Sequence, residues 1–477
     1  MIAPVPAIVV ALALAQAAGG GSAAREVPPE LPPEPLGGAV PELVPPALEV
    51  PRRYQIERVV FQGLSHTRET EVRRHVLVRE GDLLDEERVL LSRLRLLQLG
   101  WFSRVETRVE RGSERGLVVL VFDVTERNTL LVTDLVLGST GPQPIYGGLG
   151  LSQQSFLGRG LGLSGAFVYG GTPAGRPEDP SRFAVRASFF APDVAASQGT
   201  RGLVLGLTGY AARGEEFACS DPSCSAYTSN YGAAPHLSYQ RASIEPTIGI
   251  RPGAFERLLA SYRFERVNVM ESARALATPG AAPPVLPGRS LVSALIGTYE
   301  IDTRDDFFLP TEGLRGLAQV TFSSKLFGSD YEYTRYLLQL ETAFSLLWQR
   351  LRFQGALGAV QGGAPFFDRF YPADWSYFAI GPAVARSLEV NFSTDSRYDA
   401  FLAMGGFEYA IPLWHRERFF RRGYLALGAR AVYSTATLGG SRTTFSTTPY
   451  SGDIALRLDT PIGVFNASLG YAFDNLL

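Results

Sequence analysis

Residues 334–346, TRYLLQLETAFSL, decide the fold class because apolar and polar side chains alternate along the stretch. Tyr336, Leu338 and Leu340 fall on one face, whereas Arg335 falls on the other. A period of two is typical of a β-strand with one apolar and one polar face. Three further stretches show the same alternation: 291–304, 351–360 and 464–473.

The length and spacing of these stretches favour a membrane barrel over a soluble β-sandwich. Sandwich strands recur about every 8–12 residues, whereas residues 128–477 divided among about 16 strands allow about 22 residues for each. The sequence therefore predicts a mostly β chain, with a transmembrane antiparallel β-barrel of about 16 strands at 128–477 and a polar lumen. Fifteen strands can be distinguished, and either a sixteenth lies near 443–448 or the chain is one strand short. Tight turns at 251–256 and 348–350 alternate with long connections at 171–181, 214–234, 271–289, 362–400 and 435–450.

Composition and charge exclude several functional classes. The net charge of −2 provides no basic surface for nucleic acid. No apolar run of about 18 residues follows the N-terminus, so membrane-spanning helices are not expected. Two Cys and four His leave little material for a metal cluster. No Ser or Cys nucleophile motif accompanies His66, His75, His236 or His415, so we expect neither an enzyme nor a cofactor.

The N-terminal region has the features of an export signal and a spacer. Residues 1–24 contain a short apolar core followed by small residues, which predicts a secretory signal peptide. Residues 25–53 contain nine Pro and are expected to form an extended linker. In an exported chain, Cys219 and Cys224 in ACSDPSC could form a small loop disulfide.

Residues 54–127 form a separate small α/β module in this interpretation. An alternating stretch at 54–61 predicts a strand, and 67–78 is expected to be a helix with Thr67 as its N-cap. A second helix is predicted at 85–99, where apolar residues recur at helical spacing. Two strands, at 105–110 and 117–125, complete a β-α-α-β-β order.

This module and the barrel each resemble a known family. The patterns I-x-x-V-x-F-x-G-L at 56–64, G-D-x-L at 81–84 and L-x-x-L-G-x-F at 96–102 resemble a POTRA domain. Four barrel motifs are similar to those of the Omp85 superfamily, the family of BamA- and TamA-like barrels: SFLGRG at 155–160, DTRDD at 302–306 with PTEG at 310–313, PFFDRFY at 365–371 and LDTPIG at 458–463.

The resemblance implies an outer-membrane protein that assembles, inserts or translocates other proteins, with its POTRA domain in the periplasm of a Gram-negative bacterium. It implies contact with outer-membrane lipids, with unfolded client proteins and with periplasmic or lipoprotein partners. Two alternatives stay open: a secretion pore for one partner, and a passive channel without protein clients.

The resemblance also implies particular site residues. Clients would dock on the POTRA edge strand at Arg104, Val105, Thr107 and Val109 by adding a strand. The sixth outer loop would be locked to the barrel wall by Arg386 and Glu408, although only the Arg of the family's V-R-G-F pattern is kept. The C-terminal insertion signal would comprise Leu469, Tyr471 and Phe473.

Overall fold

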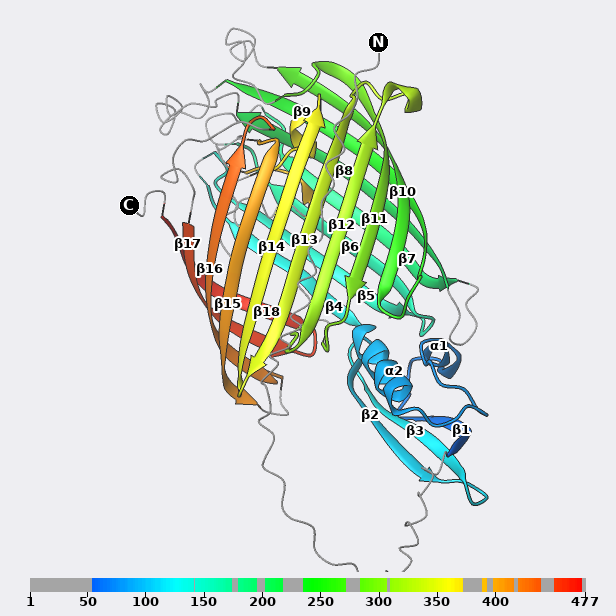
Figure 1. Cartoon of the computed structure of the whole chain (residues 1–477). Coiled ribbons are helices and arrows are strands. Elements are labelled where there is room, and N and C mark those ends of the chain that lie inside the picture. Colours follow the sequence, from blue (N-terminus) through cyan, green and yellow to red (C-terminus); the bar gives the residue numbers. More distant parts are fainter. Residues whose placement is uncertain are drawn as a thin grey trace, which may run out of the picture. The chain divides into compact units, whose positions relative to one another are not determined.

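Figure 1 shows the computed structural model of the chain, which separates into two units, Met1–Arg52 and Arg53–Leu477. Four features predicted from the sequence lie outside the described residues: the signal peptide with its linker, the pair Cys219 and Cys224, the residue Arg386, and the segment 443–448. The structure describes residues 54–140, 142–173, 179–194, 202–217, 235–271, 284–306, 309–371, 388–392, 398–415, 419–438 and 450–473.

The N-terminal module has the predicted β-α-α-β-β order. In its three-stranded sheet β3 lies in the middle, parallel to β1 and antiparallel to β2. Strands β1 and β2 therefore form the two edges of the sheet. The elements are β1 (Gln55–Gln62), α1 (Glu69–Arg74), α2 (Glu86–Gln98), β2 (Phe102–Arg111) and β3 (Leu117–Glu126).

Helix α2 begins where the sequence provides a cap. The Asp85 carboxylate accepts hydrogen bonds from the backbone N–H groups of Glu87 (3.0 Å) and Arg88 (3.3 Å), which would otherwise lack a partner. Its apolar face contributes Leu96 to a core that includes Ile56 and Phe122, all three fully buried. Among the described residues, no helix is long and apolar enough to cross a membrane.

The predicted boundaries of the first helix are wrong. Helix α1 begins at Glu69 rather than Thr67, and Arg68 occupies the N-cap position without a side-chain cap. The cause is Glu126, whose carboxylate accepts the N–H groups of His66 (2.9 Å) and Thr67 (2.8 Å) and holds them in a loop. Burial alone would raise the pKa of the Glu126 carboxyl. These hydrogen bonds, together with one from the Ser65 hydroxyl, outweigh the effect of burial and lower the pKa to about 2.

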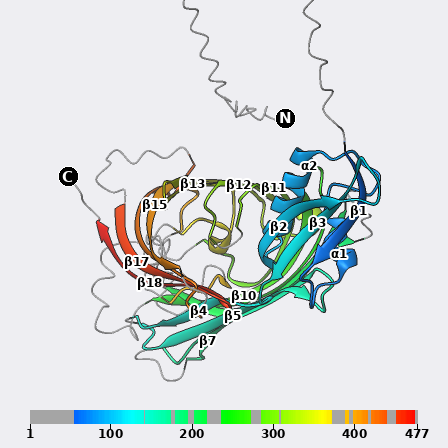
Figure 2. The same cartoon turned by 90° about the horizontal axis from the view of Figure 1, so that it is seen from below.

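The rest of the described chain forms one antiparallel sheet of fifteen strands, each paired with its neighbours in sequence. Figure 2 shows that this sheet curls into a nearly closed barrel. Its strands are β4 (Leu130–Gly138), β5 (Tyr146–Phe156), β6 (Leu161–Gly170), β7 (Arg182–Val194), β8 (Leu203–Phe217), β9 (His236–Ile250), β10 (Glu256–Glu271), β11 (Gly288–Asp302), β12 (Gly313–Ser323), β13 (Tyr333–Leu346), β14 (Gln349–Gly362), β15 (Phe401–His415), β16 (Arg422–Thr435), β17 (Tyr450–Thr460) and β18 (Gly463–Phe473). Because β16 pairs directly with β17, no strand lies between them.

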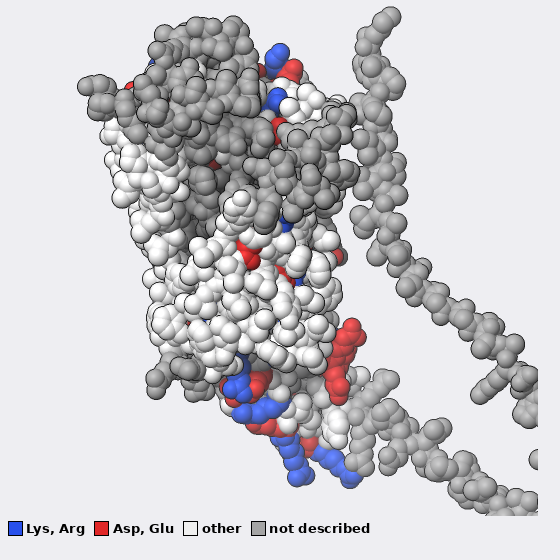
Figure 3. Space-filling model, turned by 90° about the vertical axis from the view of Figure 1, so that its left-hand side faces the viewer, with Lys and Arg blue, Asp and Glu red and all other residues white. Residues whose placement is uncertain are grey.

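The two faces of the barrel wall differ as the alternation predicts. On β13, Tyr336, Leu338 and Leu340 are exposed on the outer surface, whereas Glu341 is paired with arginines on the lumen side. The middle of the outer face seen in Figure 3 accordingly shows few charged residues. An apolar exterior and a charged interior are the arrangement expected of a membrane barrel.

The two ends of the barrel also differ. Adjacent strands are joined at one end by short turns, as at 157–160, 251–255, 347–348 and 461–462. At the other end the connections are longer, as at 218–235, 272–287 and 363–400. Since β3 ends at Glu126 and β4 begins at Leu130, the chain enters the barrel at the short-turn end.

Candidate functional site

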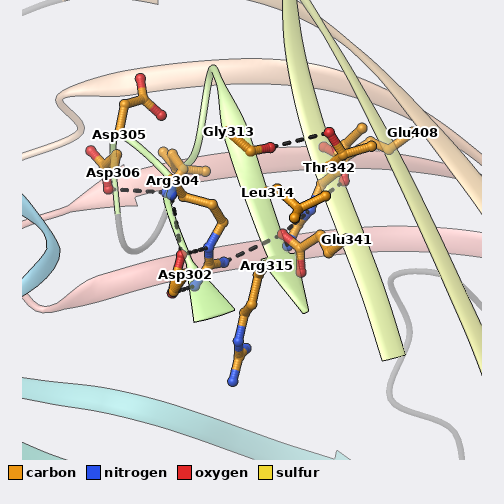
Figure 4. Close-up of polar contacts among 12 residues, drawn as sticks. Asp302, Arg304, Asp305, Asp306, Gly313, Leu314, Arg315, Glu341, Thr342 and Glu408 are labelled. Atoms are coloured by element: carbon orange, nitrogen blue, oxygen red, sulfur yellow. Dashed lines mark hydrogen bonds and ion pairs between the residues drawn. The ribbon is translucent and has the colours of Figure 1, made fainter. Parts of the chain in front are cut away.

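A series of alternating carboxylates and guanidinium groups lines the lumen side of the wall (Figure 4). Arg304, in the turn after β11, donates to Asp302 through Nε (2.9 Å) and Nη2 (2.7 Å). Its Nη1 donates to Glu341 on β13 at 3.3 Å. Glu341 also accepts a hydrogen bond from Nε of Arg352 on β14 at 2.8 Å. Each charge therefore has an oppositely charged neighbour, as charges removed from water require.

The series continues through Glu408 on β15, whose side chain is 3% exposed. Arg352 Nη1 lies 3.6 Å from Glu408 Oε2, and Arg457 on β17 donates to both carboxylate oxygens, at 2.6 and 3.1 Å. Glu408 is thus bonded to two arginines of the wall. The predicted pair with Arg386 stays a prediction, because Arg386 lies outside the described residues.

The motif at 302–313 owes its residue types to the turn that carries Arg304. The Asp305 carboxylate accepts the N–H groups of Thr311 (2.8 Å) and Glu312 (3.1 Å) and folds the turn back on itself. Gly313 has φ +109°, and a Cβ there would lie 2.6 Å from the Thr303 carbonyl oxygen, so only Gly fits without strain.

A short piece of the long connection between β14 and β15, residues 388–392, packs inside the barrel. Leu388, Val390 and Phe392 are nearly fully buried against a cluster from strands β5 to β8. The Phe392 ring stacks on Tyr146 with centroids 4.7 Å apart. The Tyr210 hydroxyl donates to the Leu388 carbonyl at 2.7 Å. Backbone and side chains together therefore attach this segment to the first half of the wall.

A carboxylate, that of Glu389, holds residues 388–392 to the wall by ion pairs. Glu389 adopts φ +56° and lies 2.7 Å from Arg241 Nη2 on β9 and 3.3 Å from Arg186 Nη2 on β7. Arg241 is 1% exposed and also donates to Glu265 on β10 at 2.5 Å. A positive φ is unfavourable for Glu. The contacts that residues 388–392 make with the barrel wall must therefore outweigh that backbone strain.

The start of the same connection is attached by a second carboxylate. Asp368, within the PFFDRFY motif, accepts hydrogen bonds from Arg263 Nη2 on β10 (2.7 Å) and from the Tyr333 hydroxyl on β13 (2.6 Å). Further along, Asn391 and Tyr398 both donate to Glu216 on β8, at 3.0 and 2.7 Å. The long connection is therefore attached to the lumen wall at several separate points.

Sequence reasoning located the loop but missed Glu389 and its two wall arginines. Matching the loop to a V-R-G-F pattern directs attention to a loop Arg and to acidic wall residues. The structure shows a loop carboxylate on a basic wall at this point. One available indication was the alternation of apolar and polar residues in LEVNF at 388–392, unusual within a long connection.

The first and last strands of the sheet, β4 and β18, meet at a seam. Among the described residues these strands share no paired register, and one backbone hydrogen bond, from Val132 N–H to the Ile462 carbonyl (2.7 Å), joins β4 to the turn before β18. Neighbouring strands alternate in direction along the fifteen-strand sheet, so β4 and β18 run parallel. Within the described residues, both strands therefore end the sheet with edges along which no ladder pairs β4 with β18.

In the N-terminal module, β2 is an edge strand beside a groove. The groove lies between α2 and β2, has a volume of about 530 Å³, and includes the half-exposed side chains of Leu90 and Val109. Of the predicted docking residues, Val105 is buried in the core, whereas Val109 is open to this groove. Arg104 pairs with Glu106 and Arg108 with Glu110, so these two arginines add little net charge to the edge.

The structure describes the side chains of two of the three residues predicted as the C-terminal insertion signal. Leu469 and Tyr471 on β18 are 78% and 65% exposed, and the side chain of Phe473 lies outside the described residues. No group of metal-ligating side chains occurs within the described ranges.

Comparisons with known proteins agree with this architecture. Residues 155–476 match the Omp85 superfamily domain, and residues 54–127 match a POTRA domain described as a surface antigen variable number repeat. The "Putative outer membrane protein assembly factor" of Treponema pallidum (strain Nichols) is 28% identical over 116 residues, which are 24% of this chain and 14% of that protein.

Two solved structures match this chain over most of its length. CdiB from Escherichia coli has a TM-score of 0.53 at 8% identity, covering 88% of this chain and 73% of that one. BamA from Haemophilus ducreyi lacking POTRA domains 1–3 has a TM-score of 0.47 at 17% identity, covering 88% and 81%. The family match spans most of the chain, and the described strands form the corresponding barrel. The chain therefore belongs to the Omp85 superfamily, and its barrel lies in the outer membrane of a Gram-negative bacterium with the POTRA domain in the periplasm.

Proposed function

We propose that this protein assembles, inserts or translocates other proteins at the outer membrane, and that a client strand enters at the seam between β4 and β18. The observation that carries the proposal is that, among the described residues, no ladder pairs β4 with β18 at that seam. In lipid, each unsatisfied backbone group costs several kcal/mol, so the two edges favour any strand that pairs with them.

The direction of the two edge strands supports a single-strand client. Because β4 and β18 run parallel, one extended strand running the opposite way pairs antiparallel with both. Such a strand would receive hydrogen bonds on both sides. No nucleotide is required, since pairing and burial of the client in lipid are themselves favourable, and we propose no catalytic step.

The POTRA domain would present the client before it reaches the seam. An extended peptide could pair with the β2 edge at Arg104, Thr107 and Val109 and place apolar side chains in the groove beside Leu90. The Arg–Glu pairs along β2 leave the edge with little net charge, which suits clients of varied sequence. Periplasmic or lipoprotein partners would use the same domain.

Three further assignments belong to this proposal. Arg386 would add a further ionic attachment of the long loop, to Glu408, beside those of Asp368 and Glu389. Leu469, Tyr471 and Phe473 would serve as the insertion signal of the barrel itself. The segment at 388–392 would keep the lumen narrow while the seam works, because it fills space between the walls with buried side chains.

Client folding in reconstituted vesicles tests the proposed function. An unfolded eight-stranded outer-membrane barrel is diluted from urea into vesicles that contain the protein, and its folded fraction is followed by heat-dependent gel mobility. We expect faster folding than in empty vesicles, and a reduced effect for the groove variant Leu90→Glu with Val109→Glu. Leu326→Glu is the matched control, since Leu326 is 88% exposed in a connection of the barrel.

The same preparation separates the alternatives. No acceleration of folding, together with large and steady conductance in planar bilayers, would replace this proposal with a passive channel. A secretion pore would give a different result: a secreted client would enter the vesicles and become protected from protease, while barrel folding would not be accelerated.

A further inference from the structure

Five residues form one row across the outer surface of strands β7 to β11, near the long-connection end. Phe183 lies opposite Arg213, Arg213 opposite Gln240, Gln240 opposite Asn268, and Asn268 opposite Arg289. Directly paired residues share a face of the sheet, so all five side chains belong to one surface. These five strands are consecutive neighbours in the barrel sheet.

The neighbouring row on the same face adds a third arginine. Ala242 lies opposite Arg266, which lies opposite Leu291. Arg266 and Arg289 are exposed, whereas Arg213 is half-buried and its guanidinium lies 5.9 Å from the Phe183 ring centroid. The three arginines surround a depression of about 710 Å³, which we call the arginine depression.

The positive charge of this surface is not neutralised by the described protein. None of the three arginines forms an ion pair with a residue that the structure describes, and Arg213 Nε is buried there without a hydrogen-bond partner. Asp330 also lines the depression, but its Oδ2 accepts the Leu291 N–H at 2.7 Å. The depression therefore carries a net positive charge and an unused donor.

The position of the arginine depression along the strands matches a membrane surface. Below it the outer face is apolar, with Ile244, Ile248, Leu258 and Phe264 exposed. From Leu258 to Arg266, eight residues at about 3.4 Å each and a tilt of about 40° correspond to roughly 20 Å of depth, close to the ~25 Å apolar band of such barrels. The arginines thus lie at the boundary between acyl chains and headgroups at the end remote from the POTRA attachment.

We propose that the arginine depression binds the phosphate groups of an anionic lipid in the outer leaflet. Guanidinium groups bind phosphate oxygens through paired N–H donors, and Gln240 and Asn268 provide neutral donors between Arg213 and Arg289. Across β8 to β11 the row spans about 14 Å, at about 4.8 Å per strand, which is wide enough for a headgroup with two phosphates. The apolar surface below accommodates its acyl chains.

Native mass spectrometry of the full chain in zwitterionic micelles tests the proposal, with bisphosphorylated lipid A as the probe. The variants are Arg213→Gln, Arg266→Gln and Arg289→Gln, singly and together. Near a membrane surface each arginine is expected to raise the affinity for phosphorylated lipid A about five-fold. The triple Arg→Gln variant should therefore bind this lipid roughly 100-fold more weakly. The triple Arg→Lys variant keeps the charge and should retain most of the binding.

A matched control keeps the change in net charge equal. Arg111→Gln, Arg115→Gln and Arg159→Gln remove three exposed arginines outside the depression and should leave binding unchanged. Dephosphorylated lipid A should bind the wild type and the triple variant alike. Heat-dependent gel mobility verifies that every variant is a folded barrel.

Two results would overturn the proposal. Equal binding of phosphorylated lipid A to the wild type and the triple Arg→Gln variant would show that the depression is not the site. Displacement of the lipid by low millimolar inorganic phosphate would show that the depression takes free phosphate rather than a membrane lipid. Neither result depends on client folding, so the proposal can fail independently of the proposed function.

Discussion

Replacing Glu389 with Gln removes the loop charge that faces Arg241 and Arg186 while keeping the size of the side chain. A hydrogen bond to a charged group contributes about 1.5–3 kcal/mol. Glu389 is 32% exposed, so solvent screening reduces this to about 1–2 kcal/mol. The apolar contacts of Phe392 remain. The fraction of molecules in which residues 388–392 are detached from the lumen wall should therefore rise about 5- to 30-fold.

Single-channel conductance in planar bilayers measures this population, because the seated segment narrows the lumen. The wild type should show small, flickering conductance, and Glu389→Gln should spend about 5- to 30-fold more time in a larger state. Phe392→Ala should have a greater effect, since removal of a buried Phe costs about 3–5 kcal/mol. Glu332→Gln is the matched control, because Glu332 is 58% exposed and lies 3.7 Å from Lys325.

Unchanged conductance in both Glu389→Gln and Phe392→Ala would show that residues 388–392 do not occupy the lumen. Arg386→Ala in the same assay tests the separate prediction of an Arg386–Glu408 pair. A rise in conductance is the outcome that supports that pair.

Three other predictions concern stability. Arg457→Ala leaves Glu408 without its bidentate partner, and breaking a buried ion pair costs about 3–5 kcal/mol, so the Tm of the barrel in detergent should fall; an unchanged Tm would mean that the pair contributes nothing. Gly313→Ala forces a Cβ to within 2.6 Å of a carbonyl oxygen at φ +109° and should cost about 1–3 kcal/mol, again visible as a lower Tm, with Gly297→Ala, where a Cβ meets open space, as the control. Burial, followed by neighbouring arginines, lowers the pKa of His75 to about 3; the unfolded chain therefore binds more protons between pH 6.5 and 3, and the POTRA domain should be about 2 kcal/mol less stable at pH 5 than at pH 7.5. Hydrogen exchange of the POTRA amides in the full chain measures this loss, which should be smaller in His75→Phe.

The strands were predictable from the sequence because their pattern is local. The alternation that places Leu338 and Leu340 outside and Glu341 inside is complete within one strand, and the structure confirms it. The turn motif at 302–313 was also recognisable, because Asp305 and Gly313 act on neighbouring backbone.

The lumen contacts were not predictable in the same way. Glu389 meets Arg241, which is 148 residues away in the chain, and no local pattern relates the two. Pairing across a lumen depends on which loop segment turns inward, and this segment is held both by the stacking of Phe392 on Tyr146 and by the ion pairs of Glu389. The partners of Glu408 were missed for the same reason, since Arg457 is 49 residues further along.

The most direct test of client entry between β4 and β18 closes the seam covalently and measures client folding. Val132→Cys with Ile462→Cys, in a chain whose Cys219 and Cys224 are replaced by Ser, places two thiols where one backbone hydrogen bond joins the edges. Ala318→Cys with Leu338→Cys is the control, since these residues already lie opposite each other on β12 and β13. We expect oxidation to abolish accelerated client folding in the seam variant, reduction to restore it, and the control to be unaffected. Full acceleration of client folding with the seam covalently closed would contradict client entry at the seam.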